Sequence, residues 1–182
     1  MRWERLFADL EARLEAEERA AVEGEVADLV RAERARLPIR NRLQAHLGEP
    51  LTWFLATGDP ALPGRLLDVG ADWILIATAS GALLIPLAAV QSIGGLSRFT
   101  APDAGEVARR LGIGVILRGL SRDRTMVRIR LRGDQRVTGT IDRVGADHFD
   151  VAVHPDDEPR RERVVREVRC LLLPAVVGVA VG

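Results

Sequence analysis

The sequence lacks several features that would point directly to a function. It contains no lysine and no tyrosine, a single cysteine, and only 4% aromatic residues among its 182. One cysteine, Cys170, excludes a disulfide within the chain and fits a reducing compartment. Its leucine neighbours predict a buried, unreactive thiol. The formal net charge is zero, which excludes a global attraction to nucleic acid or to anionic membranes.

The chain also has little that would direct it to a membrane. The segment that follows Met1 has no apolar stretch of the kind found in signal peptides. The longest apolar run, from Cys170 to Val181, is too short to span a bilayer. We therefore expect a cytoplasmic protein without a membrane partner. The use of arginine for every basic position, with abundant Ala, Gly and Val, is typical of a GC-rich bacterial genome.

What the sequence does contain is an internal repeat. Residues 64–72 read GRLLDVGAD, and a similar stretch, GTIDRVGAD, occupies 139–147. The correspondence extends without a gap from 51–77 to 126–152. A fixed internal period indicates a duplicated structural unit. The strands expected from apolar runs and turn residues are 51–57, 64–69, 73–78, 82–85 and 90–93 in the first copy and 126–132, 139–144, 148–153, 164–173 and 176–181 in the second.

Helical periodicity precedes each set of strands. Apolar residues recur at helical spacing in an N-terminal arm and in short segments at 39–47 and 106–120. Five short strands with tight turns fit a small antiparallel barrel, which hides its edges. The expected fold class is α+β, with a helical arm followed by two tandem helix-plus-five-stranded barrels. The expected segments are the arm 1–36, the first helix and barrel 37–95, a linker 96–105, and the second helix and barrel 106–182. The second copy is expected to carry about 13 extra residues, in a charged hairpin extension at 154–163.

This order of elements resembles the Sm-like and SH3-like small barrels, which also have a glycine in the second strand and a 3₁₀ turn before the fifth. Residues 131–136, with Gly139 and Ile141, look like the first Sm signature. Asp147 comes two positions late and the usual asparagine is absent, so the resemblance implies a fold but carries over no RNA-binding residues. The whole chain also resembles an uncharacterised family of high-GC Gram-positive (actinobacterial) bacteria. Members of that family are sometimes labelled transcriptional regulators, but no C-terminal helix-turn-helix supports the label in this sequence.

A row of arginines distinguishes the second copy from the first. Arg128, Arg130 and Arg132 alternate with apolar residues, so we expect them on the outer face of their strand. The wider basic set adds Arg122, Arg124 and Arg136. Such a strip can bind the phosphates of RNA or DNA without sequence preference. The other interpretation is a solvated or salt-bridged face, which is favoured by the shortage of aromatic residues that could stack on bases.

The ungapped repeat places Trp53 and Leu55 on the outer face of the first copy. Burying one large apolar side chain contributes about 1.5–3 kcal/mol, so such a face is normally covered. The expected cover is the N-terminal arm, through residues such as Trp3, or else the second copy or another subunit. Trp53, Leu55 and Trp3 are therefore the predicted protein-interaction surface.

No set of residues predicts catalysis or a cofactor. His148, Asp150 and His154 share one face of a strand and have the chemistry of a zinc or manganese site. The first copy has no equivalent ligands, so no metal is predicted. The expected function is a non-enzymatic binding or scaffold module with an unknown protein partner or self-association. The alternative is a regulator that binds RNA or DNA.

Overall fold

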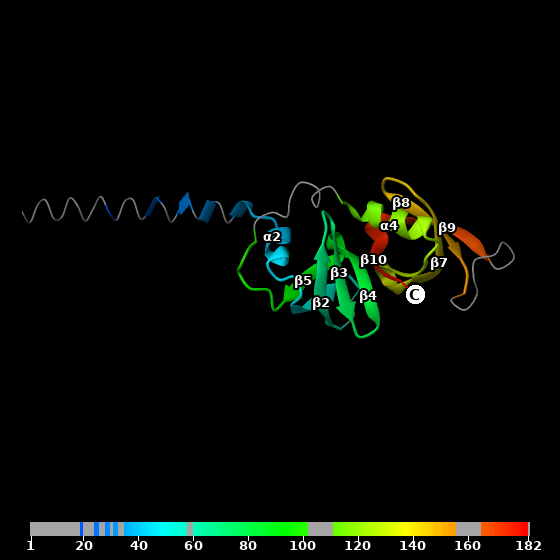
Figure 1. The fold of residues 1–182 in the computed structure, drawn as a ribbon, viewed down its shortest axis with the longest axis horizontal. Coiled ribbons are helices and arrows are strands. Elements are labelled where there is room, and N and C mark those ends of the chain that lie inside the picture. Colours follow the sequence, from blue (N-terminus) through cyan, green and yellow to red (C-terminus); the bar gives the residue numbers. More distant parts are fainter. Residues whose placement is uncertain are drawn as a thin grey trace, which may run out of the picture. The chain divides into compact units, whose positions relative to one another are not determined.

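A computed structural model of the protein describes residues 19, 24–25, 28–29, 31–32, 35–57, 60–101, 111–155 and 165–181. The chain divides into two compact units, residues 1–38 and 39–182. In the first unit the described residues between 19 and 36 are α-helical (Figure 1). Trp3 lies outside the described residues, so its predicted role stays a prediction.

The second unit has ten strands, two short α-helices and three 3₁₀ turns among its described residues. The first half contains α2 (Ile39–Gln44), β1 (Pro50–Leu55), β2 (Leu62–Val69), β3 (Trp73–Thr78), β4 (Gly81–Pro86), η1 (Leu87–Ala89) and β5 (Val90–Gly94). The second half contains α4 (Ile113–Arg122), β6 (Met126–Leu131), η2 (Arg132–Asp134), β7 (Arg136–Val144), β8 (His148–Val153), β9 (Glu167–Leu172), η3 (Leu173–Ala175) and β10 (Val176–Val181). Each strand overlaps an expected one, and β3, β8 and β10 have the expected bounds.

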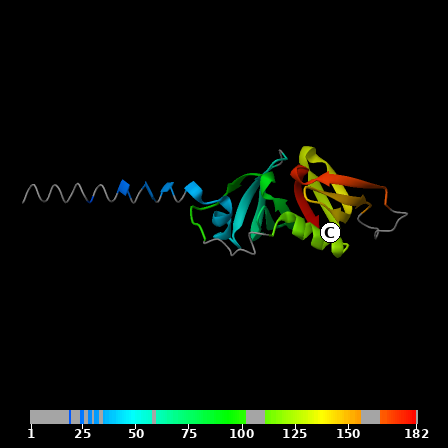
Figure 2. The ribbon, with the colours of Figure 1, turned by 90° about the horizontal axis from the view of Figure 1, so that it is seen from above.

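The strands form one antiparallel sheet in the order β5-β1-β2-β3-β4-β10-β6-β7-β8-β9. Figure 2 shows the cyan and green strands of the first half next to the yellow to red strands of the second half. The expectation of two tandem helix-plus-five-stranded barrels is therefore wrong. A separate first barrel would need β4 to pair with β5, but β4 pairs with β10, with Leu84 opposite Val179 and Leu83 opposite Ala180. This β4–β10 junction covers one strand edge of each half within a single chain, which removes two exposed edges.

The two halves nevertheless repeat each other in detail. The amide of Gly70 donates to the Trp73 carbonyl at 2.9 Å, and that of Gly145 donates to the His148 carbonyl at 2.8 Å. The ring of Trp73 or His148 lies over the glycine, where any side chain would collide with it. The register irregularity in the second strand falls at the same place in both halves. The repeated glycine is therefore explained by a close approach that only glycine permits.

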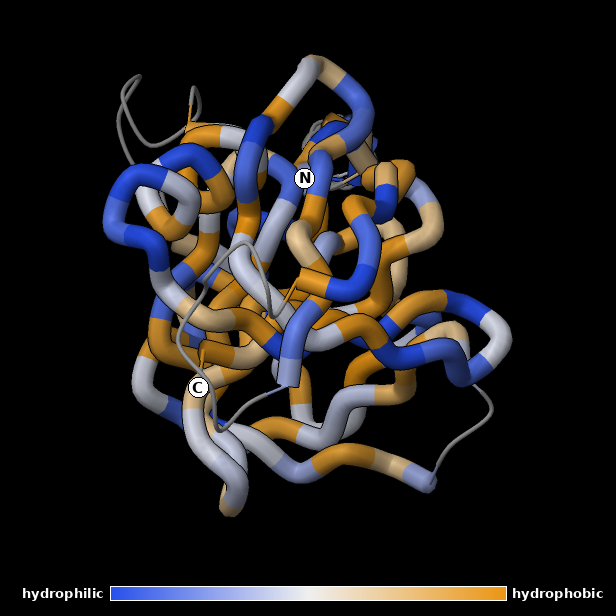
Figure 3. Tube along the Cα trace, turned by 90° about the vertical axis from the view of Figure 1, so that its right-hand side faces the viewer, coloured by the Kyte–Doolittle hydropathy of each residue, from blue (hydrophilic) through white to orange (hydrophobic). Residues whose placement is uncertain are grey.

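Two apolar clusters fill the unit, and each takes side chains from both halves. The first cluster contains Leu43, Trp53 and other first-half residues together with Val177 of β10. The second cluster consists of second-half residues together with Trp73 and Leu84 from the first half. Figure 3 shows hydrophobic segments inside the second unit and hydrophilic segments at its outer turns. Since each buried side chain contributes about 1.5–3 kcal/mol, the two halves stabilise each other across the junction.

The first strand is displaced by one position from the register that the ungapped repeat predicts. Leu51 pairs with Gly64, whereas Val127, and not Met126, pairs with the equivalent Gly139. Such a shift turns every side chain of a strand to the opposite face. The stretch from Leu51 to Gly64 therefore has one more residue than the equivalent stretch from Val127 to Gly139.

The outer face of β1 differs from the prediction for this reason. Trp53 is fully buried, and its indole Nε1 donates to the Gly64 carbonyl at 3.2 Å. Leu55 packs against the same cluster. Placing Trp53 and Leu55 on the outer face was thus wrong, and Phe54, which is 40% exposed, lies there instead.

The length of the insertion in the second half was also misjudged. Pro86 pairs with Trp73, and Leu172 pairs with His148, the equivalent of Trp73. The structural equivalent of Pro86 is therefore Leu172, which is 86 positions later, whereas the second and third strands of the two halves are 75 positions apart. The 3₁₀ turns η1 and η3, which begin directly after Pro86 and Leu172, follow the same alignment. The insertion between the third and fourth strands is thus two positions shorter than expected.

The two helices occupy equivalent places, with Leu43 of α2 and Leu117 of α4 both fully buried. The first half holds the start of α4. The Asp72 carboxylate accepts a hydrogen bond from the Ile113 amide at 2.7 Å, and Trp73 Nε1 donates to the Leu111 carbonyl at 2.8 Å. A helix that precedes the second set of strands is therefore capped by the first.

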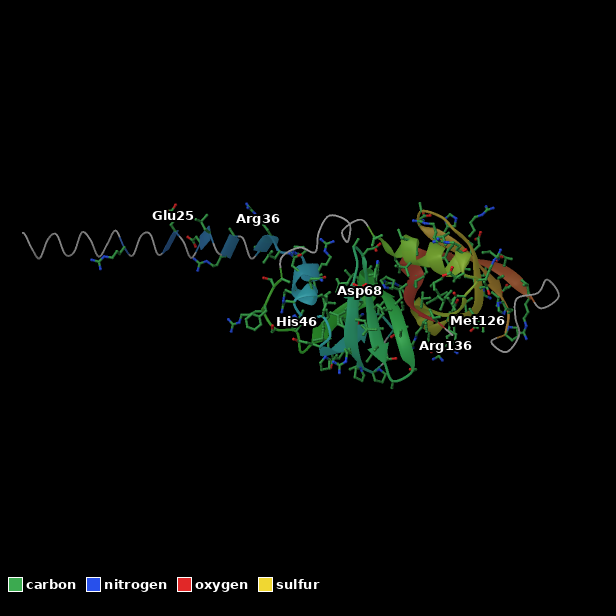
Figure 4. All side chains as sticks on the ribbon, in the orientation of Figure 1. Glu25, Arg36, His46, Asp68, Met126 and Arg136 are labelled. Carbon is green, nitrogen blue, oxygen red and sulfur yellow. The ribbon has the colours of Figure 1, made fainter. Side chains whose placement is uncertain are left out.

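Buried polar contacts fasten the segment that follows β5 to α2. His46, labelled in Figure 4, lies with Nδ1 2.7 Å from the Arg42 carbonyl, which requires that nitrogen to donate. Its Nε2 then accepts from the Ser97 amide and hydroxyl, at 3.1 and 2.8 Å. Arg42 in turn donates to the carbonyls of Leu96 and Ser97. These bonds hold the residues beside β5 in place.

Candidate functional site

The arginines of β6 lie on its outer face. Burial alternates along the strand, with Val127, Ile129 and Leu131 buried, Arg128 exposed and Arg130 half-buried. The alternation follows directly from the period of two of a strand with one face on a core. The sequence predicts this part of the site from local pattern alone.

β6 forms one side of a groove of about 360 Å³ at the β4–β10 junction. Arg128, Arg130 and Arg136 line it, with apolar side chains that include Leu83 of β4. Gly178 of β10 lies opposite Arg130, and its lack of a side chain leaves room beside Leu83. Both halves contribute to this junction groove, whose lining combines apolar side chains with three arginines. Such a lining suits a ligand that is both apolar and anionic.

A carboxylate organises two of the three guanidinium groups. Arg130 and Arg136, the latter labelled in Figure 4, are direct cross-strand partners, and like charges in that arrangement repel. Asp134 Oδ1 accepts from Arg130 Nη2 at 2.9 Å and lies 3.9 Å from Arg136 Nη2. Asp134 and Gly133 have φ values of 62° and 74°, a left-handed conformation that Asp tolerates better than most residues. The η2 turn thus places a counter-charge between the two arginines.

Arg132 has a structural position at the junction. Its Nε donates to the Pro174 carbonyl at 2.9 Å, and its Nη2 donates to the Ala88 carbonyl at 3.2 Å. These acceptors belong to η3 and η1, so one side chain links the equivalent turns of the two halves. Arg132 is therefore not among the residues that line the junction groove.

Arg122 and Arg124 lie at the end of α4, away from the residues that line the groove. Arg124 Nη1 donates to Asp142 Oδ1 at 3.3 Å, which is an ion pair with a mostly exposed guanidinium group. Of the six arginines proposed as a phosphate-binding strip, the structure brings together Arg128, Arg130 and Arg136.

The two β1 positions equivalent to Arg128 and Arg130 carry no charge. Thr52 and Phe54 pair with Gly94 and Ser92 of β5, as Arg128 and Arg130 pair with Ala180 and Gly178 of β10. The arginines that line the groove thus come from the second half alone. Exposed Phe54 takes the place that the sequence assigned to Trp53 as an apolar surface residue.

Comparison with known proteins finds no matching family model, no matching curated protein and no matching solved structure. The resemblance to Sm-like and SH3-like barrels therefore stays an expectation. In the described part of the chain, no helix is long and apolar enough to cross a membrane. Function has to be inferred from the geometry of the junction groove.

The histidines and acidic residues near β8 do not converge on one point. His148 Nδ1 donates to Asp147 at 2.8 Å, whereas His154 contacts the Thr140 hydroxyl at 2.8 Å through Nε2. Asp150 of β8 lies opposite Cys170 of β9 in the strand register. Among the residues that the structure describes, no three His, Cys, Asp or Glu side chains are placed to hold a metal ion.

Cys170 is exposed on β9, so its prediction as a buried residue was wrong. Of its leucine neighbours, Leu171 points into the core and Leu172 is exposed, while Leu173 packs against the core from the following turn. Desolvation, followed by the hydrogen bond and negative charge of Asp150 and then by the charge of Asp147, raises the pKa of the Cys170 thiol. The raised pKa keeps the sulfur protonated at neutral pH, which makes it a poor nucleophile.

Sequence reasoning missed three contributors to the junction groove. Leu83 and Gly178 come from β4 and β10, which are far apart in sequence and become neighbours only through the junction. Asp134 acts on Arg130 and Arg136 through a cross-strand pair. A signal for Asp134 existed, since Gly-Asp after a strand is typical of a tight turn that points a carboxylate back to its own hairpin.

Proposed function

We propose that the chain is a non-enzymatic binding or scaffold module of the bacterial cytoplasm, and that the junction groove is its binding site. One observation carries the proposal. Strands from both halves build a groove lined by apolar side chains and three arginines, in which the second half supplies the arginines and the first half adds Leu55, Leu62 and Leu83. The duplication thereby creates a site that a single copy lacks.

The chemistry of the groove suits an extended protein segment with acidic and apolar residues. Guanidinium groups are good donors to carboxylates, and Arg130 already donates to Asp134 at 2.9 Å, with Arg136 3.9 Å from the same oxygen. Leu83 and its apolar neighbours supply the surface for the non-polar side chains. A partner carboxylate would replace or share Asp134 as the acceptor.

The second candidate is an RNA- or DNA-associated regulator that binds phosphates through the same arginines. The favouring observation is the alignment of Arg128, Arg130 and Arg136 along one side of the groove. No aromatic side chain is among the lining residues, so base stacking would not contribute. Binding of this kind would be sequence-nonspecific and would weaken steeply with added salt.

Fluorescence anisotropy with an acidic, leucine-containing peptide, a single-stranded RNA and a duplex DNA tests both candidates. Replacing Arg128, Arg130 and Arg136 by Gln should lower the affinity for the true ligand by about tenfold or more, because hydrogen bonds to charged groups contribute about 1.5–3 kcal/mol each. The matched control replaces Arg122, Arg143 and Arg166, which are exposed and do not line the groove. We expect the control to bind as the wild type does.

Asp134→Asn provides a change in the opposite direction. It removes the competing charge and keeps a residue that accepts the left-handed conformation, so anion binding should become stronger. For a nucleic acid, the Gln variant should also reduce the slope of log affinity against log salt. Equal losses in the site variant and its control, or no binding of any of the three probes, would contradict the proposal.

A further inference from the structure

The ten-stranded sheet ends in two different edges, β5 at one end and β9 at the other. In terms of the repeat, β9 is the fourth strand of the second half and β5 is the fifth strand of the first half. Inside the chain, the β4–β10 junction pairs a fourth strand with a fifth strand of the other half. The two edges that stay open are therefore the two partners of a second junction of the same kind.

The β9 edge exposes an apolar stripe. Val168 and Leu172 are 61% and 58% exposed, and Cys170 lies between them on the same face of the strand. The equivalent of Cys170 on β4 is Leu84, which is only 4% exposed because it packs into the second-half cluster. The neighbouring half covers Leu84 at the internal junction, whereas its equivalent Cys170 is exposed at the β9 edge of the sheet.

The β5 edge borders an open groove of about 290 Å³. The apolar residues that line this β5 groove include Ile39, Leu87, Val90 and Ile93. The equivalent second-half residues, all in or against the cluster that contains Leu84, are Ile113, Leu173, Val176 and Val179. In the second half this place is filled by the fourth strand of the first half. In the first half the same apolar place has no occupant among the described residues of the chain.

We propose that β9 of one molecule pairs with β5 of a second copy, which repeats the β4–β10 junction between chains. The register follows from the internal junction, where Leu84 is opposite Val179. The equivalent residues are Cys170 and Ile93, so these two stand opposite each other. Each molecule contacts one neighbour through β9 and the other through β5. Such head-to-tail contacts produce rings when the rotation between neighbours closes and open chains when it does not.

The contact between chains is weaker than the internal one. His148 and Asp150 occupy the positions that Trp73 and Leu75 hold beside the internal junction. A more polar face contributes less burial of apolar surface, so assembly depends on protein concentration. The inference makes no use of the arginines of the junction groove, so its failure would leave the proposed binding function untouched.

The mass of the full chain in solution tests the inference. Sedimentation over a range of concentrations should give species heavier than the 19.9 kDa monomer, with their share increasing with concentration. Cys170→Lys places a charge in the middle of the β9 stripe and should leave only monomer. The matched control, Leu67→Lys, changes a β2 residue that is 44% exposed and lies on an interior strand of the sheet, and it should assemble as the wild type does. A wild-type chain that is monomeric throughout, or a Cys170→Lys variant that still assembles, overturns the inference.

Disulfide trapping tests the register. Opposed residues of antiparallel strands have Cα atoms about 4.5–5.5 Å apart, within the range that a disulfide spans. Under mild oxidation, Ile93→Cys should link to Cys170 of the next molecule, and this product should disappear when Cys170→Ser is added. Gln91→Cys is the matched control, since its diagonal distance to Cys170 would be about 7–8 Å, too far for a disulfide. Equal linking by both variants, or linking that survives Cys170→Ser, overturns the proposed pairing.

Discussion

At the scale of single residues, the pKa of Asp147 is lowered chiefly by its neighbour His148. His148 Nδ1 donates to Asp147 Oδ1 at 2.8 Å. This hydrogen bond is the main cause that lowers the pKa of Asp147; desolvation acts in the opposite direction, and the charge of His148 adds to the lowering. The folded protein therefore favours the carboxylate form of Asp147 more than the unfolded chain does.

We expect the pKa of Asp147 to lie below its ordinary value and to rise toward that value in His148→Gln. A depressed folded-state pKa contributes stability that is present above the unfolded pKa and is lost as pH falls through the folded pKa. The loss of this stability is thus confined to acid conditions. Carbon-13 NMR titration of the side-chain carboxyl groups measures the pKa, and an Asp147 titration that is the same in both proteins would rule out the histidine as the cause of its shift.

At the scale of elements, β7 and β8 approach each other closely at Gly139. A Cβ at this position would collide with the Ala152 carbonyl and lie 3.1 Å from Val151 Cγ1. A Cβ added at the first-half equivalent, Gly64, would lie 2.9 Å from Ile76 Cδ1 and 3.2 Å from the Ala77 carbonyl oxygen. The repeated glycine therefore marks a tight strand crossing in both halves.

Gly139→Ala should lower the free energy of unfolding by about 1–3 kcal/mol or more, because a backbone carbonyl cannot move aside as a flexible side chain can. Gly119→Ala is the matched control, since no atom lies within 4 Å of the added carbon in α4. There alanine should raise stability by up to about 1 kcal/mol. Urea denaturation gives both values, and two changes of the same sign would contradict the close approach at Gly139.

Most strands, but not the direction of every side chain on them, can be predicted from the sequence. The strands are predictable because turn residues such as Gly70 and Gly145 separate short apolar runs, which is local information. Which side chains of β1 point into the core is not predictable, because Trp53 and Phe54 are both large and apolar. One added residue before the second strand exchanges the buried and the exposed positions. The arginines of the site are visible in the alternation along β6. The side of the groove that β4 and β10 form is not, because it depends on pairing between distant strands.

At the scale of the whole molecule, the halves are held together by specific polar contacts as well as by shared cores. Asp72 caps the start of α4 through the Ile113 amide, and Arg132 links the carbonyls of Pro174 and Ala88. Sequence could not choose this arrangement over two closed barrels, because the edges of β4 and β5 carry no signal for which strand they pair with. The choice is made by side chains such as Leu84 that fit the core of the other half.

Asp72→Ala should cost about 0.5–2 kcal/mol of stability, since it removes the side-chain acceptor at the start of α4. Asp147→Ala is the matched control, because Asp147 has the same place in the repeat but an exposed carboxylate whose side-chain partner is the neighbouring His148. We expect that change to be close to neutral at neutral pH. Thermal unfolding compares the two, and equal losses would show that the cap does not join the halves.

The central claim is that β4 pairs with β10, so that both copies share a single sheet. Backbone nuclear Overhauser effects in the full chain test it most directly. The account predicts cross-strand contacts that join Leu84 to Val179 and Leu83 to Ala180. Cross-strand contacts that join β4 to β5 within the first half, and so close a separate barrel, would contradict it.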